Sequence, residues 1–365
     1  MSEELVHQLA LELIPGIGQK SIKQLISYCG SASEVVSTPK NRLLKIPGVG
    51  HKMASAIKSV NTFRHSEEII SSCEKKGIQI LHYLDATFPK KLKLIYDAPN
   101  ILYFKGSGNL NPPRIISIVG ARKATRYGKE ITDKIVSELA LVGVTIVSGL
   151  AYGIDIQAHR AALKNNVPTF AIIAGGLDMV YPSAHKKYAE QMLQTGGIIS
   201  ESLPGTKPDP HLFPQRNRII AGISDATIVV EAAERGGALI TANLADSYGR
   251  IVFAVPGDVG NTFSEGANRL IASQKALIYT GAQDLIYHLG WELDGQADDP
   301  QPIPELEPAE EQMYLLLKES GKAIEIDKIA LMSEIPINQV ASILLSLEFK
   351  NLIKSLPGKK YVLIK

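Results

Sequence analysis

The sequence contains few cysteines and no long apolar run. Cys29 and Cys73 are the only thiols among 365 residues, which is too few for a disulfide framework or a zinc cage and favours a reducing compartment. No apolar stretch approaches the roughly 20 residues that span a bilayer. The opening residues MSEELVHQ are acidic, where a signal peptide is basic and then apolar. We therefore expect a soluble cytoplasmic protein that holds no metal and does not enter a membrane.

The sequence motifs of several large enzyme classes are also absent. The chain has no G-x-x-x-x-G-K-[ST] loop, no G-x-G-x-x-G turn, no H-E-x-x-H and no G-x-S-x-G, and its cysteines and histidines form no constellation. His159 follows a glycine turn and is interpreted as a hydrogen-bonding partner of that turn rather than as a base. These absences predict a protein with no cofactor and no catalytic activity.

The charge is small in total and unevenly distributed. The formal net charge is +2, but residues 1–66 carry eight Lys/Arg against four Asp/Glu, a balance of +4. Residues 292–311 carry eight acids, four prolines and no base. Such a stretch cannot bury enough surface to fold, so residues 291–310 are predicted to form an acidic, proline-rich linker. The whole chain is 45% hydrophobic and 21% charged, as is usual for globular proteins.

Apolar runs alternate with helical patterns across residues 106–290. Short, nearly continuous apolar strands between amphipathic helices are typical of a parallel sheet with helices on both faces. The expected strands are Ile115–Val119, Val144–Ser148, Thr169–Ala174, Ile198–Ser200, Ala226–Glu231, Ile251–Val255 and Leu277–Tyr279. The expected helices are Tyr127–Val142, Ile154–Lys164, His185–Gln194, Gln215–Gly222, Ala238–Tyr248 and Ala267–Gln274. Residues 67–105 are predicted to be a connecting segment packed on this α/β core.

Two short repeats occupy the N-terminal region. Leu13–Gly18 reads L-I-P-G-I-G and Lys45–Gly50 reads K-I-P-G-V-G, each with helical patterns on both sides. This is the helix-hairpin-helix pattern, which predicts a small SAM-like domain over residues 1–66. A turn that opens a helix leaves backbone N–H groups free for a phosphate, although the hairpins can equally serve only to pack the domain. The candidate phosphate contacts are Gly16, Gly18, Lys20, Gly48, Gly50 and Lys52.

Small and polar residues end every expected strand of the core, where ligands bind in parallel sheets. The densest cluster is Lys207–Arg218, K-P-D-P-H-L-F-P-Q-R-N-R. Its arginines are expected to neutralise phosphates, its asparagine to bind a base edge or fix the loop, and its phenylalanine to stack on a base. Together with Arg122, these arginines are predicted to line one edge of the sheet as a positive groove for an unpaired polynucleotide. Alternatively, the arginines pair with acids such as Glu201 or Glu231 and the phenylalanine lies in the core.

The same motifs resemble those of a known family. G-A-R, S-G-L-A-x-G-I-D, G-G-L-D-x-x-Y-P, F-P-x-R-N-R-I-I-A-G, L-I-T-A and G-R-x-V-x-A-V-P-G occur in the order found in the DNA-processing protein A family (DprA, also called Smf). The resemblance covers about Gly106–Gly290. It implies a Rossmann-like core that binds single-stranded DNA, often as a homodimer. It also implies that the protein protects incoming DNA during natural transformation and helps to load a RecA-type recombinase.

The resemblance also carries residue roles onto this chain. Gly236 replaces a serine that is common in the family, which removes a hydroxyl and leaves backbone N–H groups as the donors there. The DNA-binding residues expected in the core are Arg122, Ser148, Gly149, Gly153, Lys207, Phe213, Arg216, Asn217, Arg218, Gly236 and Gly237.

Residues 311–365 predict a winged helix. The expected helices Glu311–Lys318, Ile326–Met332 and Asn338–Phe349 precede a hairpin that contains L-P-G-K-K. In DNA-binding modules of this kind the third helix enters a duplex groove. Here that helix has a base only just beyond its end, at Lys350, and residues 305–365 carry eight bases against nine acids. The pattern favours docking of a partner, or weak duplex contact, over sequence-specific binding.

Two other functions remain open at the level of sequence. The pattern R-N-R-I-I, then a strand and a glycine pair before a helix, is also similar to that of nucleotide phosphoribohydrolases of the lonely-guy type. Residues 231–239 lack the threonine and the following glutamate of that enzyme motif, but Glu231 and Glu234 remain available as acids. In the second alternative the winged helix reads duplex DNA and the core senses a ligand, which the weakly charged third helix does not favour.

Overall fold

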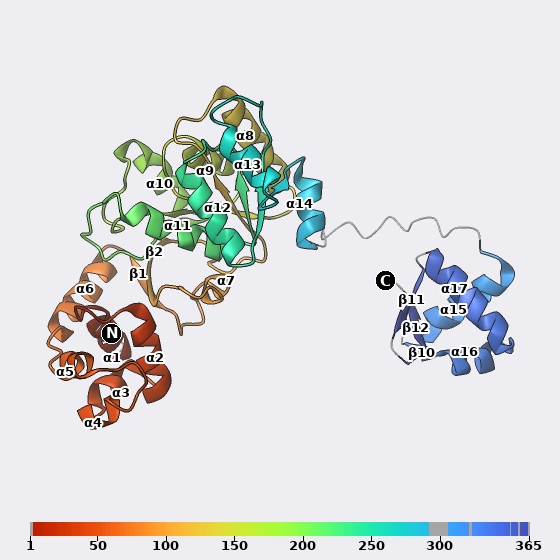
Figure 1. The fold of residues 1–365 in the computed structure, drawn as a ribbon, viewed down its shortest axis with the longest axis horizontal. Helices are drawn as coiled ribbons and strands as arrows, with labels where there is room; N and C mark the ends of the chain where they lie inside the picture. The colour runs from red at the N-terminus through yellow and green to blue at the C-terminus, as the bar shows by residue number, and fades with distance from the viewer. Residues whose placement is uncertain (1–2, 292–305, 321–322, 351, 357, 364–365) are drawn as a thin grey trace. The chain divides into compact units, whose positions relative to one another are not determined.

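The computed structural model describes residues 3–291, 306–320, 323–350, 352–356 and 358–363. The chain forms two compact units, residues 1–291 and 292–365 (Figure 1). Most of the predicted linker, residues 292–305, lies outside the described residues. Its last three residues, 308–310, already belong to helix α15 (Pro308–Ser320), so the linker ends earlier than expected.

Six helices form the N-terminal part of the first unit. They are α1 (Glu3–Glu12), α2 (Gln19–Cys29), α3 (Ala32–Ser37), α4 (Lys40–Leu43), α5 (His51–Lys58) and α6 (Phe63–Lys75). The α1–α2 and α4–α5 turns pass through Gly16 (φ +81°) and Gly48 (φ +75°), a backbone conformation that favours glycine. Gly18 and Gly50 then cap α2 and α5 with extended backbone. The tandem hairpin predicted from the repeats is confirmed, but α6 runs across the predicted boundary at residue 66.

A nine-stranded sheet forms the centre of the first unit, in the order β1-β2-β6-β5-β4-β3-β7-β8-β9. Seven strands pair in parallel: β3 (Ile115–Val119), β4 (Thr145–Ser148), β5 (Thr169–Ile172), β6 (Gly197–Ser200), β7 (Ala226–Val229), β8 (Ile251–Ala254) and β9 (Leu277–Ile278). They correspond to the seven strands expected from the sequence. The sheet as a whole is mixed, because β1 (Gln79–His82) and β2 (Ile101–Gly106) join it in antiparallel pairing beside β6.

The two antiparallel strands change the expected role of residues 67–105. This segment was predicted to be a connection packed on the core, with a boundary at residue 106. Instead it supplies β1, helix α7 (Lys90–Lys93) and most of β2, and residue 106 is the last residue of β2. The segment is therefore part of the sheet, and the boundary at 106 cuts through a strand.

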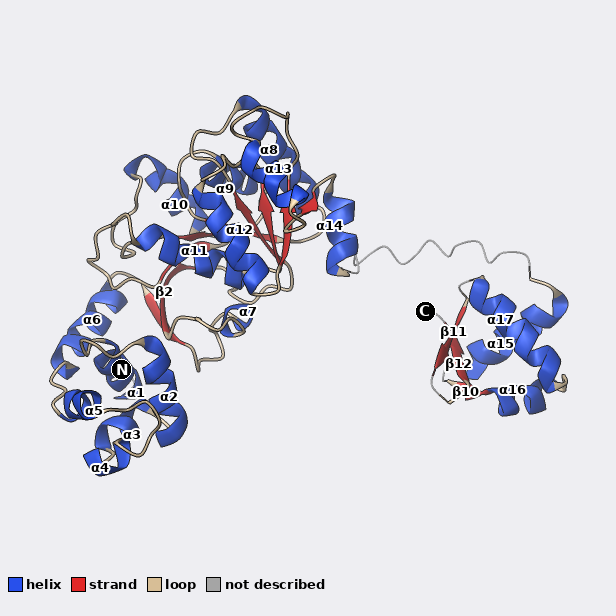
Figure 2. Cartoon of the chain, in the orientation of Figure 1, coloured by secondary structure: helices blue, strands red, loops and turns tan. Residues whose placement is uncertain are grey.

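Helices cover both faces of the sheet (Figure 2). On one face α8 (Arg126–Ala140) packs against α9 (Ile154–Lys164), followed by α10 (Lys186–Met192); α14 (Ala282–Leu289) also contacts α8. On the other face α11 (Leu212–Ile223) packs against α12 (Gly237–Ser247), and α13 (Glu265–Ala272) joins the same apolar cluster. From β3 the chain winds outward to β6 and then returns to place β7 beside β3. This reversal is the switch point at which doubly wound sheets bind ligands.

The described residues of the second unit form three helices and a small sheet. Its helices are α15, α16 (Ile326–Ser333) and α17 (Ile337–Phe349), and its strands β10 (Ile324–Glu325), β11 (Ile353–Leu356) and β12 (Lys360–Leu363) pair in the order β10-β12-β11. This is the predicted winged helix. No single described helix is long and apolar enough to cross a membrane. The bent pair α16–α17 meets that test by length and composition alone, and both helices bury apolar side chains in the core of this unit.

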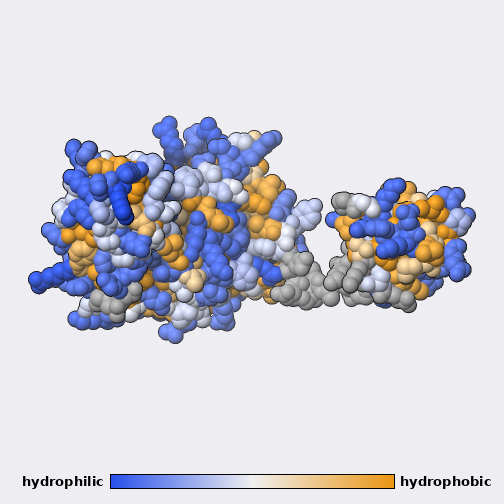
Figure 3. All heavy atoms as spheres, turned by 90° about the horizontal axis from the view of Figure 1, so that it is seen from below, coloured by the Kyte–Doolittle hydropathy of each residue, from blue (hydrophilic) through white to orange (hydrophobic). Residues whose placement is uncertain are grey.

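The exposed face of α17 carries large apolar side chains among uncharged polar ones, and no base. Ile337, Leu345 and Phe349 are exposed, Phe349 by 80%, and apolar side chains are visible on the surface of this unit (Figure 3). Lys350, just beyond the helix, pairs with Glu310 at 2.6 Å. The absence of a base on the described residues of α17 is consistent with docking of a partner or weak duplex contact, which the sequence favours over sequence-specific binding.

Candidate nucleic-acid interface

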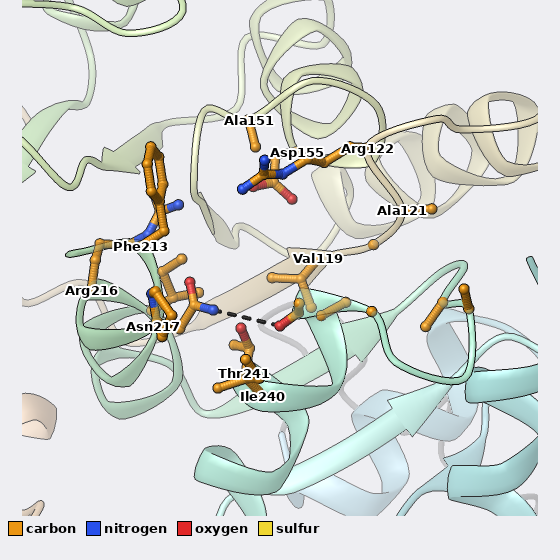
Figure 4. A pocket seen from close by; sticks show the side chains of 18 of the residues that line it. Val119, Ala121, Arg122, Ala151, Asp155, Phe213, Arg216, Asn217, Ile240 and Thr241 are labelled. Atoms are coloured by element: carbon orange, nitrogen blue, oxygen red, sulfur yellow. Dashed lines mark hydrogen bonds between the residues drawn. The ribbon is translucent and has the colours of Figure 1, made fainter. Parts of the chain in front are cut away.

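A pocket of about 410 Å³ opens at the switch point, at the carboxyl ends of β3 and β7 (Figure 4). Its walls come from the turn after β3, the loop before α9 with the first turn of that helix, the start of α11, the stretch from the loop after β7 into α12, and Phe263 before α13. Six of the eleven residues predicted in the core line this pocket: Arg122, Phe213, Arg216, Asn217, Gly236 and Gly237. The pocket therefore lies where the topology rule places a ligand.

Phe213 presents a half-buried ring to two guanidinium groups. The Arg122 guanidinium carbon lies 5.5 Å from the ring centre and that of Arg216 lies 6.0 Å from it. Arg122 is exposed, and its side chain points back into the pocket from the turn after β3 (Figure 4). A cation over an aromatic face within about 6 Å is attracted by the ring. The pocket therefore combines a movable surface cation with an aromatic face.

Arg216 forms the floor of the pocket rather than its rim. Its side chain is only 6% exposed, and it donates hydrogen bonds to the carbonyl oxygens of Gly149, at 2.6 Å, and Ile172. Burial lowers the pKa of Arg216 to about 10, against the opposing effect of the Asp155 carboxylate. Its Nε atom is buried without a hydrogen-bond partner among the described residues. Arg216 therefore stays charged at pH 7 and ties the ends of β4 and β5 together.

Asp155 provides the matching buried acid. Burial raises the pKa of its carboxyl, and the Arg216 guanidinium is the strongest influence that lowers it. A Cβ atom added to Gly149 would lie 2.6 Å from Asp155 Oδ2 and 2.7 Å from Arg216 Nη1. Both charged groups therefore converge on the space that Gly149 leaves open. Gly149 does not line the pocket, but its missing side chain leaves room for the two residues that form the pocket floor.

Arg218 points away from the pocket. Its guanidinium pairs with the Glu201 carboxylate and donates to the Asp97 carbonyl oxygen at 2.5 Å. Gln19 Nε2, at the start of α2, donates to the same carboxylate at 2.5 Å. The expectation of three arginines in one row along the sheet edge is therefore wrong: Arg122 is exposed, Arg216 is buried, and Arg218 neutralises Glu201.

The first turn of α12 closes the pocket on the side opposite Arg122. Gly236 caps this helix with extended backbone and without a side-chain hydrogen bond. Asn217 Nδ2 donates to the Gly237 carbonyl oxygen at 3.5 Å, the dashed line in Figure 4. A helix N-terminus favours anions because its first N–H groups and its dipole point toward them. Among the described residues, no side chain caps the first N–H groups of α12, so these groups are available to an anion.

The other predicted core residues lie outside the pocket lining. Ser148 is buried and donates to the Ile118 carbonyl oxygen at 2.6 Å. Gly153 has φ +82°, and a Cβ atom there would overlap the Ala121 carbonyl oxygen. Lys207 is exposed in the loop after β6. Ser148 and Gly153 thus hold the strand ends in place, whereas Lys207 is a surface cation near the site.

The two hairpins differ in their surroundings. The first packs on the rest of the unit: Lys23 Nζ donates to the Ala98 carbonyl oxygen at 2.6 Å, and Lys20 lies 5.9 Å from the Tyr96 ring centre. In the second hairpin Gly48, Gly50 and Lys52 are exposed to solvent. Gly16 and Gly18 of the first turn are exposed as well. The glycines of both turns are therefore accessible to solvent, and the hairpins differ in the contacts of their lysines.

Three family models match the chain. The model described as DNA recombination-mediator protein A matches residues 79–290, more than half of the chain, the DprA winged helix domain matches residues 297–359, and the SAM-like helix-hairpin-helix tandem matches residues 9–60. The chain belongs to the DNA recombination-mediator protein A family.

Relatives and solved structures agree with this assignment. Protein Smf of Synechocystis sp. is 32% identical over 99% of both chains, and DNA processing protein DprA of Bacillus subtilis is 39% identical over 60% of this chain and 74% of that protein. The X-ray structure of DprA from Streptococcus pneumoniae matches with a TM-score of 0.67 at 31% identity, covering 79% of this chain and 98% of that chain. A Helicobacter pylori structure, described by its single-stranded DNA binding mode, matches with a TM-score of 0.53 at 31% identity, covering 58% and 95%.

Sequence reasoning missed two charged residues of the pocket in this family member. Asp155 lies inside the quoted motif S-G-L-A-x-G-I-D but was given no role, and Lys123 directly follows Arg122; both line the pocket. The acid of that motif was a usable signal, because a carboxylate in the first turn of a helix that follows a strand end lies where ligands and cations gather. Its partner Arg216 is distant in sequence, so the pairing becomes visible only in the folded chain.

The acids of the phosphoribohydrolase alternative are engaged elsewhere. Glu231 is buried and accepts hydrogen bonds from Thr125, one of them from its backbone N–H at 3.0 Å, while Glu234 pairs with Arg269 at 2.6 Å. Neither lines the pocket. His159 is also buried: its Nδ1 lies 2.8 Å from Thr169 Oγ1, and burial lowers its pKa to about 3. Its partner is on β5, not in the glycine turn as expected.

Proposed function

We propose that this protein binds single-stranded DNA without altering it chemically, and that the strand enters the pocket between β3 and β7. The observation that carries the proposal is the convergence of Arg122, Phe213 and the uncapped start of α12 on one pocket. Arg122 and the neighbouring Lys123 neutralise phosphates, the α12 N–H groups receive a further phosphate, and Phe213 stacks on a base. None of these contacts reads a base edge, so little sequence preference is expected.

Titration of a labelled oligothymidylate with the full chain tests this proposal. Arg122→Ala is expected to weaken binding about 10-fold at low salt and to reduce the slope of log K against log salt by about 0.7, the value for one phosphate contact on a single strand. Arg126→Ala is the matched control, because Arg126 is exposed and pairs with Glu130 at 2.6 Å within α8. Equal affinity of the parent and Arg122→Ala at low salt would contradict the assignment of the site.

The absence of catalysis is part of the proposal. It is supported by the positions of Glu231 and Glu234, which are bound to other groups outside the pocket. Incubation of the protein with nucleoside monophosphates should release no free base. Steady release at a rate proportional to protein concentration would favour the phosphoribohydrolase function instead.

We further propose the cellular role that family membership suggests. In the cytoplasm the protein protects incoming single strands during natural transformation and helps a RecA-type recombinase to load. It should therefore shield a labelled strand from exonuclease and shorten the lag of RecA ATPase on strands coated with single-strand-binding protein. Unchanged digestion and an unchanged lag would reject this role while leaving DNA binding intact.

A homodimer is proposed on the same grounds. The open edge of β9 supports it, because Leu277 and Ile278 are 39% and 48% exposed on an edge strand with no further partner among the described residues. Unpaired strand edges readily pair with another chain. Light scattering after gel filtration should give a dimer for the parent and a monomer for Ile278→Lys, and a parent that is monomeric at micromolar concentration would reject it.

A further inference from the structure

The edge of the sheet around the pocket carries exposed tyrosines that the pocket does not use. Tyr152, in the loop after β4, is 51% exposed and Tyr181, in the loop after β5, is 54% exposed. Tyr127, in the first turn of α8, is 49% exposed and contacts the loop after β8 instead of the loops after β4 and β5. Exposed aromatic side chains gathered beside a binding pocket indicate an extended contact surface. The loops after β4 and β5 and the start of α8 offer two possible paths for a strand that leaves the pocket.

Tyr181 continues the stacking surface of the pocket. Its ring centre lies 6.1 Å from that of Phe213, with 59° between the ring planes. Tyr127 has a different environment: its hydroxyl donates to the Pro256 carbonyl oxygen at 3.3 Å, in the loop after β8. Within the described residues, Tyr181 is the exposed tyrosine whose ring contacts Phe213 of the pocket.

Lys207 is held on the same side as Tyr181. The loops after β5 and β6 are joined by hydrogen bonds from Gly176 N to the Thr206 carbonyl oxygen at 2.9 Å and from Gly205 N to Asp178 Oδ1 at 2.7 Å. These bonds fix the backbone directly before Lys207 against the loop that carries Tyr181.

The acids of these two loops are already partnered. Asp178 also pairs with Lys76 at 3.7 Å, and Asp209 lies 2.5 Å from His211. Lys207 pairs with no carboxylate among the described residues. A free cation thus accompanies the exposed ring, the combination that binds the backbone and the bases of a single strand.

We propose that the single strand leaves the pocket over Tyr181, which stacks on the base next to the one on Phe213, while Lys207 pairs with the intervening phosphate. This inference rests on the proposed DNA binding and adds the path of the strand and a second base site to it. It gives Lys207, which does not line the pocket, a direct role in binding. It also predicts that contacts on the α8 side contribute little.

Affinity measurements with oligothymidylates of about 3 and about 12 nucleotides test the path. Tyr181→Ala should weaken binding of the longer strand about 10-fold and change binding of the shorter strand less than about 2-fold, because loss of one stacked base affects only strands that reach beyond Phe213. Tyr181→Phe keeps the ring and should bind like the parent. Tyr127→Ala, the matched control on the α8 side, should also bind both strands like the parent.

Photocrosslinking provides a readout that does not depend on affinity. With 5-iodouracil next to the 5′ or 3′ end of the longer strand, the crosslinked peptide should contain Tyr181 in one of the two series. Loss of affinity in Tyr127→Ala with full affinity in Tyr181→Ala, or crosslinks at Tyr127 alone, would overturn the path. Failure of the parent to bind either strand would instead reject the proposed function, so the two failures are distinguishable.

Discussion

The buried Arg216 guanidinium, whose charge compensates the buried Asp155 carboxylate, makes a strong prediction about stability. Arg216→Met preserves much of the side-chain volume but removes the cation, and it leaves Asp155 buried without its main partner. It also removes the donors that bind the carbonyl oxygens of Gly149 and Ile172. A buried charge left without compensation destabilises a protein by about 3–5 kcal/mol. Since whole domains are stable by only about 5–15 kcal/mol, the variant should be folded but much less stable.

The pH dependence of the variant follows from the acid that remains. Burial already raises the pKa of Asp155, and loss of Arg216 removes the strongest influence that lowers it. A carboxyl whose folded-state pKa lies above its unfolded value destabilises the fold at high pH, and protonation relieves that effect as the pH falls. The free energy of unfolding of Arg216→Met should therefore rise relative to the parent as the pH is lowered from 8 to 5, by at most about 1.4 kcal/mol per unit.

Urea denaturation followed by circular dichroism measures both effects. The double variant Arg216→Met/Asp155→Asn carries no buried charge in the floor of the pocket and should recover at least about 2 kcal/mol of the loss. A loss below about 1 kcal/mol for Arg216→Met, or a double variant as unstable as the sum of the two single variants, would refute the reasoning. Arg216 would then be a replaceable side chain and not the support of the pocket floor.

Two further predictions concern other positions. Burial raises the pKa of the Glu12 carboxyl to about 7; a hydrogen bond from Asn100 opposes this shift and Glu201 adds to it. Because this folded-state pKa exceeds the unfolded value, the urea midpoint should rise as the pH falls from 8 to 6, and Glu12→Gln should abolish that rise. An unchanged pH profile in Glu12→Gln would assign the effect to another group. Gly153→Ala should lower stability by about 2–3 kcal/mol and weaken DNA binding, because a Cβ there overlaps the Ala121 carbonyl oxygen at φ +82°. Gly143→Ala, at φ +65° in open space, should cost about 1 kcal/mol and leave binding unchanged, and similar melting temperatures for the two alanine variants would contradict the crowding at Gly153.

The parallel strands were predictable because each is a short, nearly continuous apolar run, which is recognisable in the sequence without knowledge of its neighbours in the sheet. β3 and β7 are buried along their whole length, so their sequences show it directly. The apolar run of β2 has the same character, but its antiparallel pairing with β6 joins residues about a hundred positions apart. The apolar run of β2 is a local signal for a strand, but its partner and its antiparallel direction are decided by the assembled sheet, and the alternation of strands and helices that marks the parallel core begins only after it.

The arginines of α11 show that composition can identify a functional segment without giving the direction of each side chain. Arg216, Asn217 and Arg218 are consecutive in sequence, and their composition correctly drew attention to this segment. In a helix, however, successive side chains are about 100° apart, so Arg216 and Arg218 project about 200° from each other. One enters the floor of the pocket and the other reaches Glu201. The helix itself was predicted, so its geometry already argued against a single row of arginines.

The pocket is assembled from five separate stretches of chain between Val119 and Phe263. No fragment shorter than that span contains all of its walls, and the walls meet only after β3, β4 and β7 have paired. A partly folded chain therefore does not bind the ligand of this pocket. A ligand that recognises the pocket stabilises only the native sheet. By mass action such a ligand, present at about 100 times its Kd, adds about 2.7 kcal/mol to the stability of that sheet.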